Sequence, residues 1–175
     1  MTALRLSLAL LFVVACGVVT PYTITRPVPE QTVEGSPLGA VLPGVEIPIP
    51  LEIDLEAEAD AQNAGPVQTV TLEALRLDIT TTAEPAGDTD DWDFVDSVVI
   101  YVESSEPGSA LARREVARLD PTPNGVRQLE MDTDTSVNLR PYVDEGARLT
   151  ATVRGRAPAD DVSYDGVVTL GLSFL

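Results

Sequence analysis

The clearest pattern in the chain is an alternation of apolar and polar residues that begins at Val45 and runs to Leu55. Every second position is apolar, and the positions between them are acidic or proline. This period of two predicts a half-buried β-strand. Pro48 and Pro50 cannot donate a backbone hydrogen bond to a neighbouring strand, so we expect this strand to lie at the edge of a sheet.

The same period recurs along the rest of the chain and changes phase once, between Leu72 and Leu75. A phase change inside a strand predicts a β-bulge near Glu73 and Ala74. Besides the strand that carries this bulge, further strands are predicted at residues 98–102, 111–119, 128–132, 149–153 and 164–174. In the last of these, Asp165-Gly166 indicates either a bulge or a break.

Turn sequences separate the predicted strands. Residues 63–66 break the chain, residues 92–96 and 139–143 are expected to form short turns, and residues 120–125 contain the Asn-Gly pair that is typical of hairpins. No stretch shows the sustained 3.6-residue period of a helix. About seven strands joined by turns predict an all-β fold, an antiparallel β-sandwich with immunoglobulin-like topology; a jelly roll or a small barrel is the alternative.

The residues before Val45 have a different composition. Arg5 is followed by ten uncharged, mostly apolar residues, Leu6 to Ala15. This run is too short for a membrane span, which needs about 20 residues, and it is typical of a secretory signal peptide. Residues 17–44 are rich in proline and glycine, which predicts a tether. The expected organisation is a signal peptide at 1–15, Cys16 and a tether at 16–44, and a sandwich domain at 45–175.

Cys16 is the only cysteine, and the residues Val13-Val14-Ala15-Cys16 resemble the lipobox of bacterial lipoproteins. Membership of that family implies cleavage before Cys16, acylation of this cysteine with chains such as palmitate, and attachment to a membrane of the cell envelope. Two or more acyl chains give stable anchoring. By the same resemblance, Gly17 favours the outer membrane over the inner one. An ordinary secretory signal that contains a cysteine is the alternative.

A second resemblance concerns the domain. The stretch from Trp92 through Ile100-Tyr101-Val102 to Phe174 is similar to a pattern in uncharacterised bacterial envelope lipoproteins. This resemblance implies a β-sandwich and no particular activity.

Charge and missing residue types limit the function. The net charge is −17 and all eleven basic residues are arginine. Such a chain repels nucleic acid and anionic headgroups, so we expect no nucleic-acid partner and an attachment to the membrane through lipid. The acidity favours solubility, with specific cation binding as the alternative. The chain has no histidine, which excludes Ser-His-Asp and Cys-His catalysis and histidine-based zinc sites.

We therefore expect no enzyme and no required cofactor, but a structural, adhesive or assembly role with an envelope protein as partner. The alternative is a ligand-binding module for calcium, a glycan or an apolar molecule. Calcium takes six to eight oxygen ligands. The candidate carboxylates form one cluster, although Trp92 interrupts the EF-hand spacing: Asp88, Asp90, Asp91, Asp93 and Asp96. Trp92 could stack on a sugar, or it could close one end of the core.

Overall fold

The computed structural model describes residues 22–36, 45–50, 53–81 and 89–175, which form nine β-strands and two short helices. The strands are β1 Tyr22–Val33, β2 Val45–Pro50, β3 Val67–Ile79, β4 Val95–Ser104, β5 Arg114–Leu119, β6 Gln128–Glu130, β7 Asp132–Thr133, β8 Ala147–Gly155 and β9 Val162–Phe174. The helices are α1 Leu55–Ala61 and α2 Arg140–Asp144.

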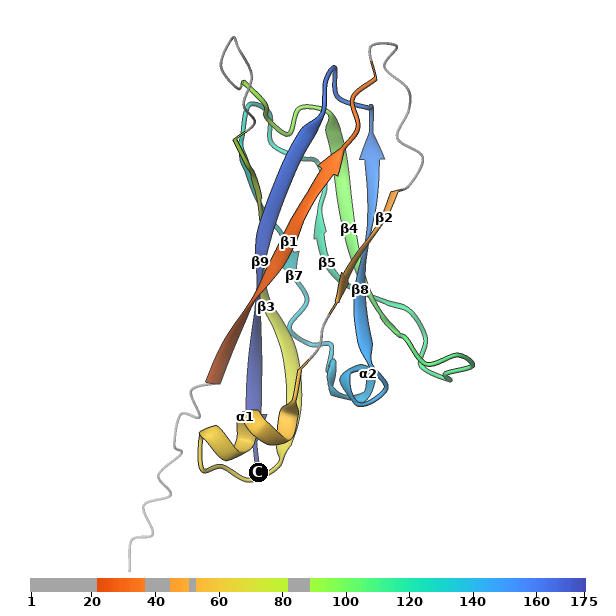
Figure 1. Cartoon of the computed structure of the whole chain (residues 1–175). Coiled ribbons are helices and arrows are strands. Elements are labelled where there is room, and N and C mark those ends of the chain that lie inside the picture. The colour runs from red at the N-terminus through yellow and green to blue at the C-terminus, as the bar shows by residue number, and fades with distance from the viewer. Residues whose placement is uncertain (1–21, 37–44, 51–52, 82–88) are drawn as a thin grey trace, which may run out of the picture.

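The strands form two antiparallel sheets packed face to face (Figure 1). One sheet has the order β1-β9-β3-β6 and the other the order β2-β8-β4-β5-β7. The pairs are nested along the chain: β1 with β9, β2 with β8, β3 with β6, and β4 with β5. The predicted antiparallel sandwich is confirmed, and the sheets do not close into a barrel.

Strand order decides between the two sandwich topologies that the sequence left open. In an immunoglobulin-like sandwich the last strand lies in the same sheet as the third and sixth strands. Here the last strand, β9, lies between β1 and β3. The nested pairs are those of a jelly roll, with the short β7 added at the edge of one sheet.

The tether predicted at residues 17–44 is the largest difference from expectation. Residues 22–33 form β1, which pairs with β9 over almost its whole length. The sequence hides this strand because only Ile24 and Val28 are buried in it. Pro27 and Pro29 also suggest a linker, but β1 is an edge strand, where a missing N–H is tolerated. The register shifts between Val28 and Gln31, next to Pro29.

The strand predicted at residues 45–55 is confirmed in its first half. β2 pairs only with β8, so it is an edge strand, as its prolines indicated. The alternation then misleads, because the chain enters helix α1 at Leu55. Asp54 begins this helix, since its side chain accepts a hydrogen bond from the N–H of Ala57 at 2.9 Å.

The long central strands follow their predicted pattern. The β-bulge expected near Glu73 is present, since the register of β3 with β9 shifts between Leu72 and Ala74. Leu72 and Leu75, on either side of it, are both buried. The bulge therefore returns the apolar residues to the core after the change of phase. The inner faces of β4, β8 and β9 supply a further part of the core: Val98, Ile100, Val102, Leu149, Ala151, Val153, Val168, Leu170 and Leu172.

Two of the predicted connections differ from expectation. Residues 120–125 form a turn, but they lead from β5 in one sheet to β6 in the other, so Asn124-Gly125 does not close a hairpin. The connection at residues 139–143 contains the short helix α2, which has Pro141 in its first turn. Asp165-Gly166 neither breaks nor bulges β9, which stays in register with β3 there.

The sandwich has two distinct ends (Figure 1). At one end, called here the α1 end, lie the start of β1 at Tyr22, helix α1 and the C-terminal Leu175. Tyr22 pairs with Leu172, and its ring lies 6.2 Å from that of Phe174. At the other end β1 finishes, β8 finishes and β9 begins. Within the described residues, no helix is long and apolar enough to cross a membrane.

Candidate functional site

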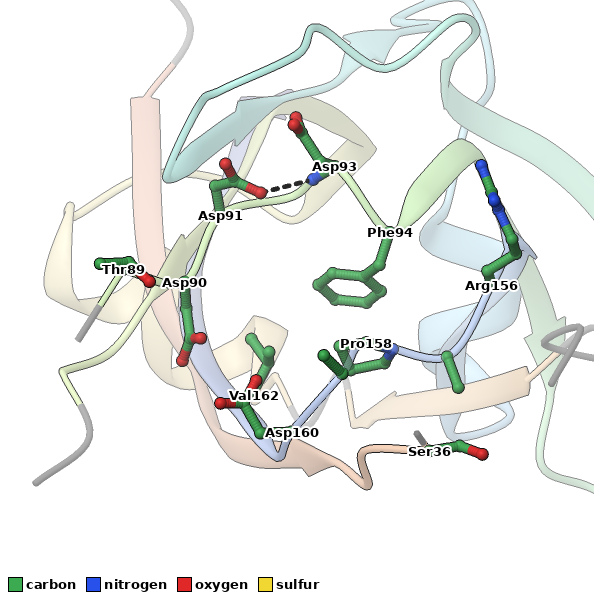
Figure 2. A pocket seen from close by; sticks show the side chains of 12 residues that line it. Ser36, Thr89, Asp90, Asp91, Asp93, Phe94, Arg156, Pro158, Asp160 and Val162 are labelled. Atoms are coloured by element: carbon green, nitrogen blue, oxygen red, sulfur yellow. Dashed lines mark hydrogen bonds between the residues drawn. The ribbon is translucent and has the colours of Figure 1, made fainter. Parts of the chain in front are cut away.

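An open cavity of about 480 Å³ lies at the end of the sandwich opposite α1, called here the cavity end. Its described walls come from three segments: Ser36 after β1, residues 89–94 before β4, and residues 156–162 between β8 and β9 (Figure 2). These segments are far apart in the sequence. The nested pairing of the strands brings them together at one end.

Residues 89–94 are held to the 120–127 connection by backbone and side-chain hydrogen bonds. The N–H of Trp92 donates to the carbonyl of Val126 at 2.9 Å. The Asp93 carboxylate accepts from the N–H of Gly125 at 2.5 Å. Within the segment, the Asp91 carboxylate accepts from the N–H of Asp93 at 3.0 Å (Figure 2). The short turn predicted at residues 92–96 is confirmed in its first part, since the N–H of Val95 donates to the carbonyl of Trp92, whereas Val95 and Asp96 already belong to β4.

Trp92 closes the core at this end. It is 3% exposed, and its indole N–H donates to the carbonyl of Arg127 at 3.2 Å. Its ring stacks on Phe94, with centroids 5.6 Å apart, and tilts against Tyr164 at 5.4 Å. Of the two roles considered for Trp92, this position fits the core plug. Phe94, two residues later, is the aromatic residue whose ring points into the cavity (Figure 2).

Tyr164 is buried beside this plug with an unusual hydroxyl group. Its side chain is 2% exposed, and the hydroxyl has no hydrogen-bond partner among the described residues. Burial raises the pKa of Tyr164 to about 12. An unsatisfied buried hydroxyl costs stability, so the cavity end contains a local weakness that the sequence does not reveal.

The wall opposite residues 89–94 is held by close backbone contacts. The N–H of Arg156 donates to the carbonyl of Phe94, and the N–H of Ser36 to the carbonyl of Pro158, both at 2.8 Å. Gly35 passes so close to Asp160 that an added Cβ would lie 2.3 Å from its carbonyl carbon. Only glycine fits at this crossing, so Gly35 is needed where the chain leaves β1.

The charged groups around the cavity differ in their freedom to bind. The carboxylates of Asp91 and Asp93 already accept backbone N–H groups of this end. Arg156 and Asp160 are exposed, and no hydrogen bond or ion pair involves their side chains within the described residues. Together with the Phe94 ring, a guanidinium and a carboxylate are thus available to a ligand.

The predicted calcium cluster is only partly assembled in the structure. Asp88 lies outside the described residues. Asp90, Asp91 and Asp93 line the cavity, whereas Asp96 lies on β4 and does not. Across residues 22–36, 53–81 and 89–175, no group of three acidic side chains is arranged to hold a metal ion. Calcium binding therefore stays a prediction, as does lipidation of Cys16, which also lies outside the described residues.

Three residues that line the cavity were not singled out from the sequence: Phe94, Arg156 and Asp160. Phe94 was within reach of sequence reasoning, because it follows Trp92 in the same turn. Arg156 and Asp160 carry no local signal. They reach the cavity because the connection between β8 and β9 crosses the end of the sandwich beside β1.

No family model and no curated protein matches this chain. Among solved structures, it is similar to a decameric BFDV capsid protein, with 15% identity and a TM-score of 0.44 over 89% of this chain and 99% of that chain. A 60-mer of BFDV capsid protein has 10% identity and a TM-score of 0.37, over 89% of this chain and 94% of that chain. A structure of turnip yellow mosaic virus has 14% identity and a TM-score of 0.27, over 89% of this chain and 96% of that chain. Similarities at this level identify neither a family nor a function.

Proposed function

We propose that this chain is a non-catalytic binding domain of a bacterial cell envelope, anchored to a membrane by acylation of Cys16. The observation that carries the proposal is the position of the only cysteine, directly after an uncharged run of ten residues and next to Ala15. Two or more acyl chains on this residue would give stable anchoring. Gly17 supports the outer membrane as the destination, by the lipoprotein resemblance.

A non-catalytic role is supported by the chemistry at the cavity end. The chain has no histidine to act as a general base. Asp91 and Asp93 are engaged in holding the loop that carries them. These features favour binding over catalysis, and we propose a structural, adhesive or assembly role through contact with another envelope protein.

Replacement of the acylation site tests the anchor. Cys16→Ser should move the protein from the membrane fraction to the soluble fraction, because the acidic domain has no electrostatic hold on anionic lipid. Thr20→Ser, a conservative change in the same segment, is the matched control and should stay in the membrane. Incorporation of a labelled fatty acid should be lost in Cys16→Ser alone. If Cys16→Ser stays with the membrane after a high-salt wash, the lipid anchor is wrong.

A second candidate function, glycan binding, is favoured by the cavity itself. An aromatic ring gives a sugar an apolar face to pack on, and the Arg156 guanidinium and Asp160 carboxylate can form hydrogen bonds with hydroxyl groups. Ligand pockets typically combine apolar surface with a few polar groups in this way. The cavity has the volume of a small-molecule site, at about 480 Å³.

Binding of envelope glycans to the purified domain tests this candidate. Asp160→Asn and Arg156→Gln should each weaken binding without unfolding the protein, because both side chains are exposed. Arg148→Gln, on the outer face of β8, is the control and should bind as the unchanged chain does. Thermal melts with a glycan or with millimolar calcium test the two ligands side by side, since a ligand at 100 times its Kd raises the free energy of unfolding by about 2.7 kcal/mol. A melting temperature that changes with neither ligand would exclude both glycan binding and calcium binding.

A further inference from the structure

The distance between Cys16 and the folded domain is short. β1 begins at Tyr22, only six residues after the cysteine. Six residues span about 20 Å when the chain is fully extended. A tether running to Val45 would have let the domain lie several tens of Å from the membrane, whereas this one keeps Tyr22 within about 20 Å of an anchored Cys16.

The attachment point lies at one end of an elongated body. Tyr22 is at the α1 end, where it pairs with Leu172 near the end of β9. β9 has 13 residues, which corresponds to about 40 Å at the usual rise per residue. The cavity lies at the other end of this strand, near Val162. The sandwich is therefore about twice as long as the reach of the tether.

The charge of the domain opposes contact along its length. The whole chain carries a net charge of −17, so a sandwich lying flat would place many carboxylates within a Debye length, about 8–10 Å, of anionic headgroups. A sandwich standing on the α1 end exposes only that end to repulsion. Helix α1 contributes Glu56, Glu58 and Asp60 there, and Arg26 pairs with Glu58 at 2.8 Å.

From these observations we infer that the sandwich stands on the membrane with its α1 end toward the bilayer and its cavity end directed away from it. This orientation rests on the proposed acylation of Cys16. The acidic helix α1 faces the headgroups without inserting. The cavity is presented to partners or ligands that approach from the aqueous side, about 40 Å farther out.

Two labelled positions test the orientation. Gln62→Cys places a fluorophore just after α1, and Asn124→Cys places one in the exposed turn beside the cavity. The acylated protein is purified and reconstituted into vesicles that contain anionic lipid and a lipid carrying a headgroup quencher. We expect strong quenching at Gln62→Cys and little or none at Asn124→Cys. Equal quenching at both positions, or stronger quenching at Asn124→Cys, would overturn the inference.

A lengthened tether provides the matched control. Insertion of about ten Gly and Ser residues after Gly17 leaves the cysteine and the domain unchanged but lets the domain move away from the membrane. Quenching at Gln62→Cys should then fall; unchanged quenching would show that something other than the short tether holds this end close. Failure of the anchor itself is distinguished by flotation, because a protein without acylated Cys16 would not float with the vesicles at all.

Discussion

The two ends of the sandwich are closed in different ways. At the α1 end lie the capped helix α1, the paired rings of Tyr22 and Phe174 and the end of β9. At the cavity end, Trp92, Phe94 and Tyr164 pack together beneath loops that leave an open cavity. The comparison teaches that the same nested strands can end beside a helix or beside a cavity.

The stability of the domain should depend more on the buried side chains of the cavity end than on helix α1. Trp92 is almost fully buried and holds the connection at residues 120–127 through its backbone and its indole N–H. Helix α1 buries only Ala59 fully. Changes at the cavity end should therefore affect stability more than changes at the α1 end.

The largest effect is expected at Trp92. Trp92→Ala should lower the free energy of unfolding by about 3–5 kcal/mol, because the substitution removes a large buried ring and leaves a void. Urea denaturation followed by circular dichroism measures the change. A loss below about 1 kcal/mol would show that the aromatic plug does not close this end.

An increase in stability is expected at Tyr164. Tyr164→Phe removes a buried hydroxyl that has no hydrogen-bond partner among the described residues, and it should raise the free energy of unfolding by about 1–2 kcal/mol. A decrease would show that the hydroxyl is satisfied by water or by residues outside the described ranges.

The stability gained by Tyr164→Phe should also depend on pH. Below pH 10 the Tyr164 hydroxyl is neutral in both the folded and the unfolded chain. As the pH rises from 10 to about 12, the unfolded chain loses this proton while the folded chain keeps it, so folding loses stability. Thermal melts at pH 9 and pH 11 should show a larger advantage of Tyr164→Phe at the higher pH. An equal advantage at both would contradict the raised pKa.

At the α1 end a smaller effect is expected from the helix cap. Asp54→Ala removes the carboxylate that accepts from the N–H of Ala57, and it should cost about 1 kcal/mol. Asp54→Ser keeps a capping oxygen and is the matched control. Ligand binding at the cavity should be unchanged in both variants, since α1 lies at the opposite end of the sandwich.

The smallest effect concerns the connection between β4 and β5. The hydroxyl of Ser109 donates to the Glu145 carboxylate at 2.5 Å and is the main cause of the lowered pKa of Glu145. Ser109→Ala should raise that pKa toward its ordinary value, as an NMR titration of the carboxyl group can measure. A lowered pKa stabilises the fold above the ordinary value of 4.5, and this contribution disappears as the pH falls. The variant should therefore lose less stability on acidification than the unchanged chain.

The sequence predicted the parts of this fold that depend on local pattern. The edge position of β2 followed from Pro48 and Pro50, and the bulge in β3 followed from the change of phase near Glu73. Helix α1 was missed because its first residue, Leu55, continues the alternation of β2. β1 was missed because an edge strand with two buried residues and two prolines has the composition of a linker.

The topology and the cavity depend on distant contacts that no local pattern encodes. The pairing of β4 with β5 joins strands that are close in the sequence, so a local pattern can predict it. β1 pairs with β9 although almost the whole chain separates them. Asn124-Gly125 misled for the same reason, since its flanking strands belong to different sheets. Arg156 and Asp160 reach the cavity only after these pairs have formed.

The proposed orientation, with the α1 end toward the membrane and the cavity end away from it, requires that the chain is anchored at Cys16. Mass spectrometry of the N-terminal peptide, extracted from membranes of the producing bacterium, tests this most directly. The account predicts a chain that starts at Cys16 and carries a diacylglyceryl group on its sulfur. A chain with an unmodified Cys16, whatever its first residue, would contradict the anchor and with it the orientation of the sandwich.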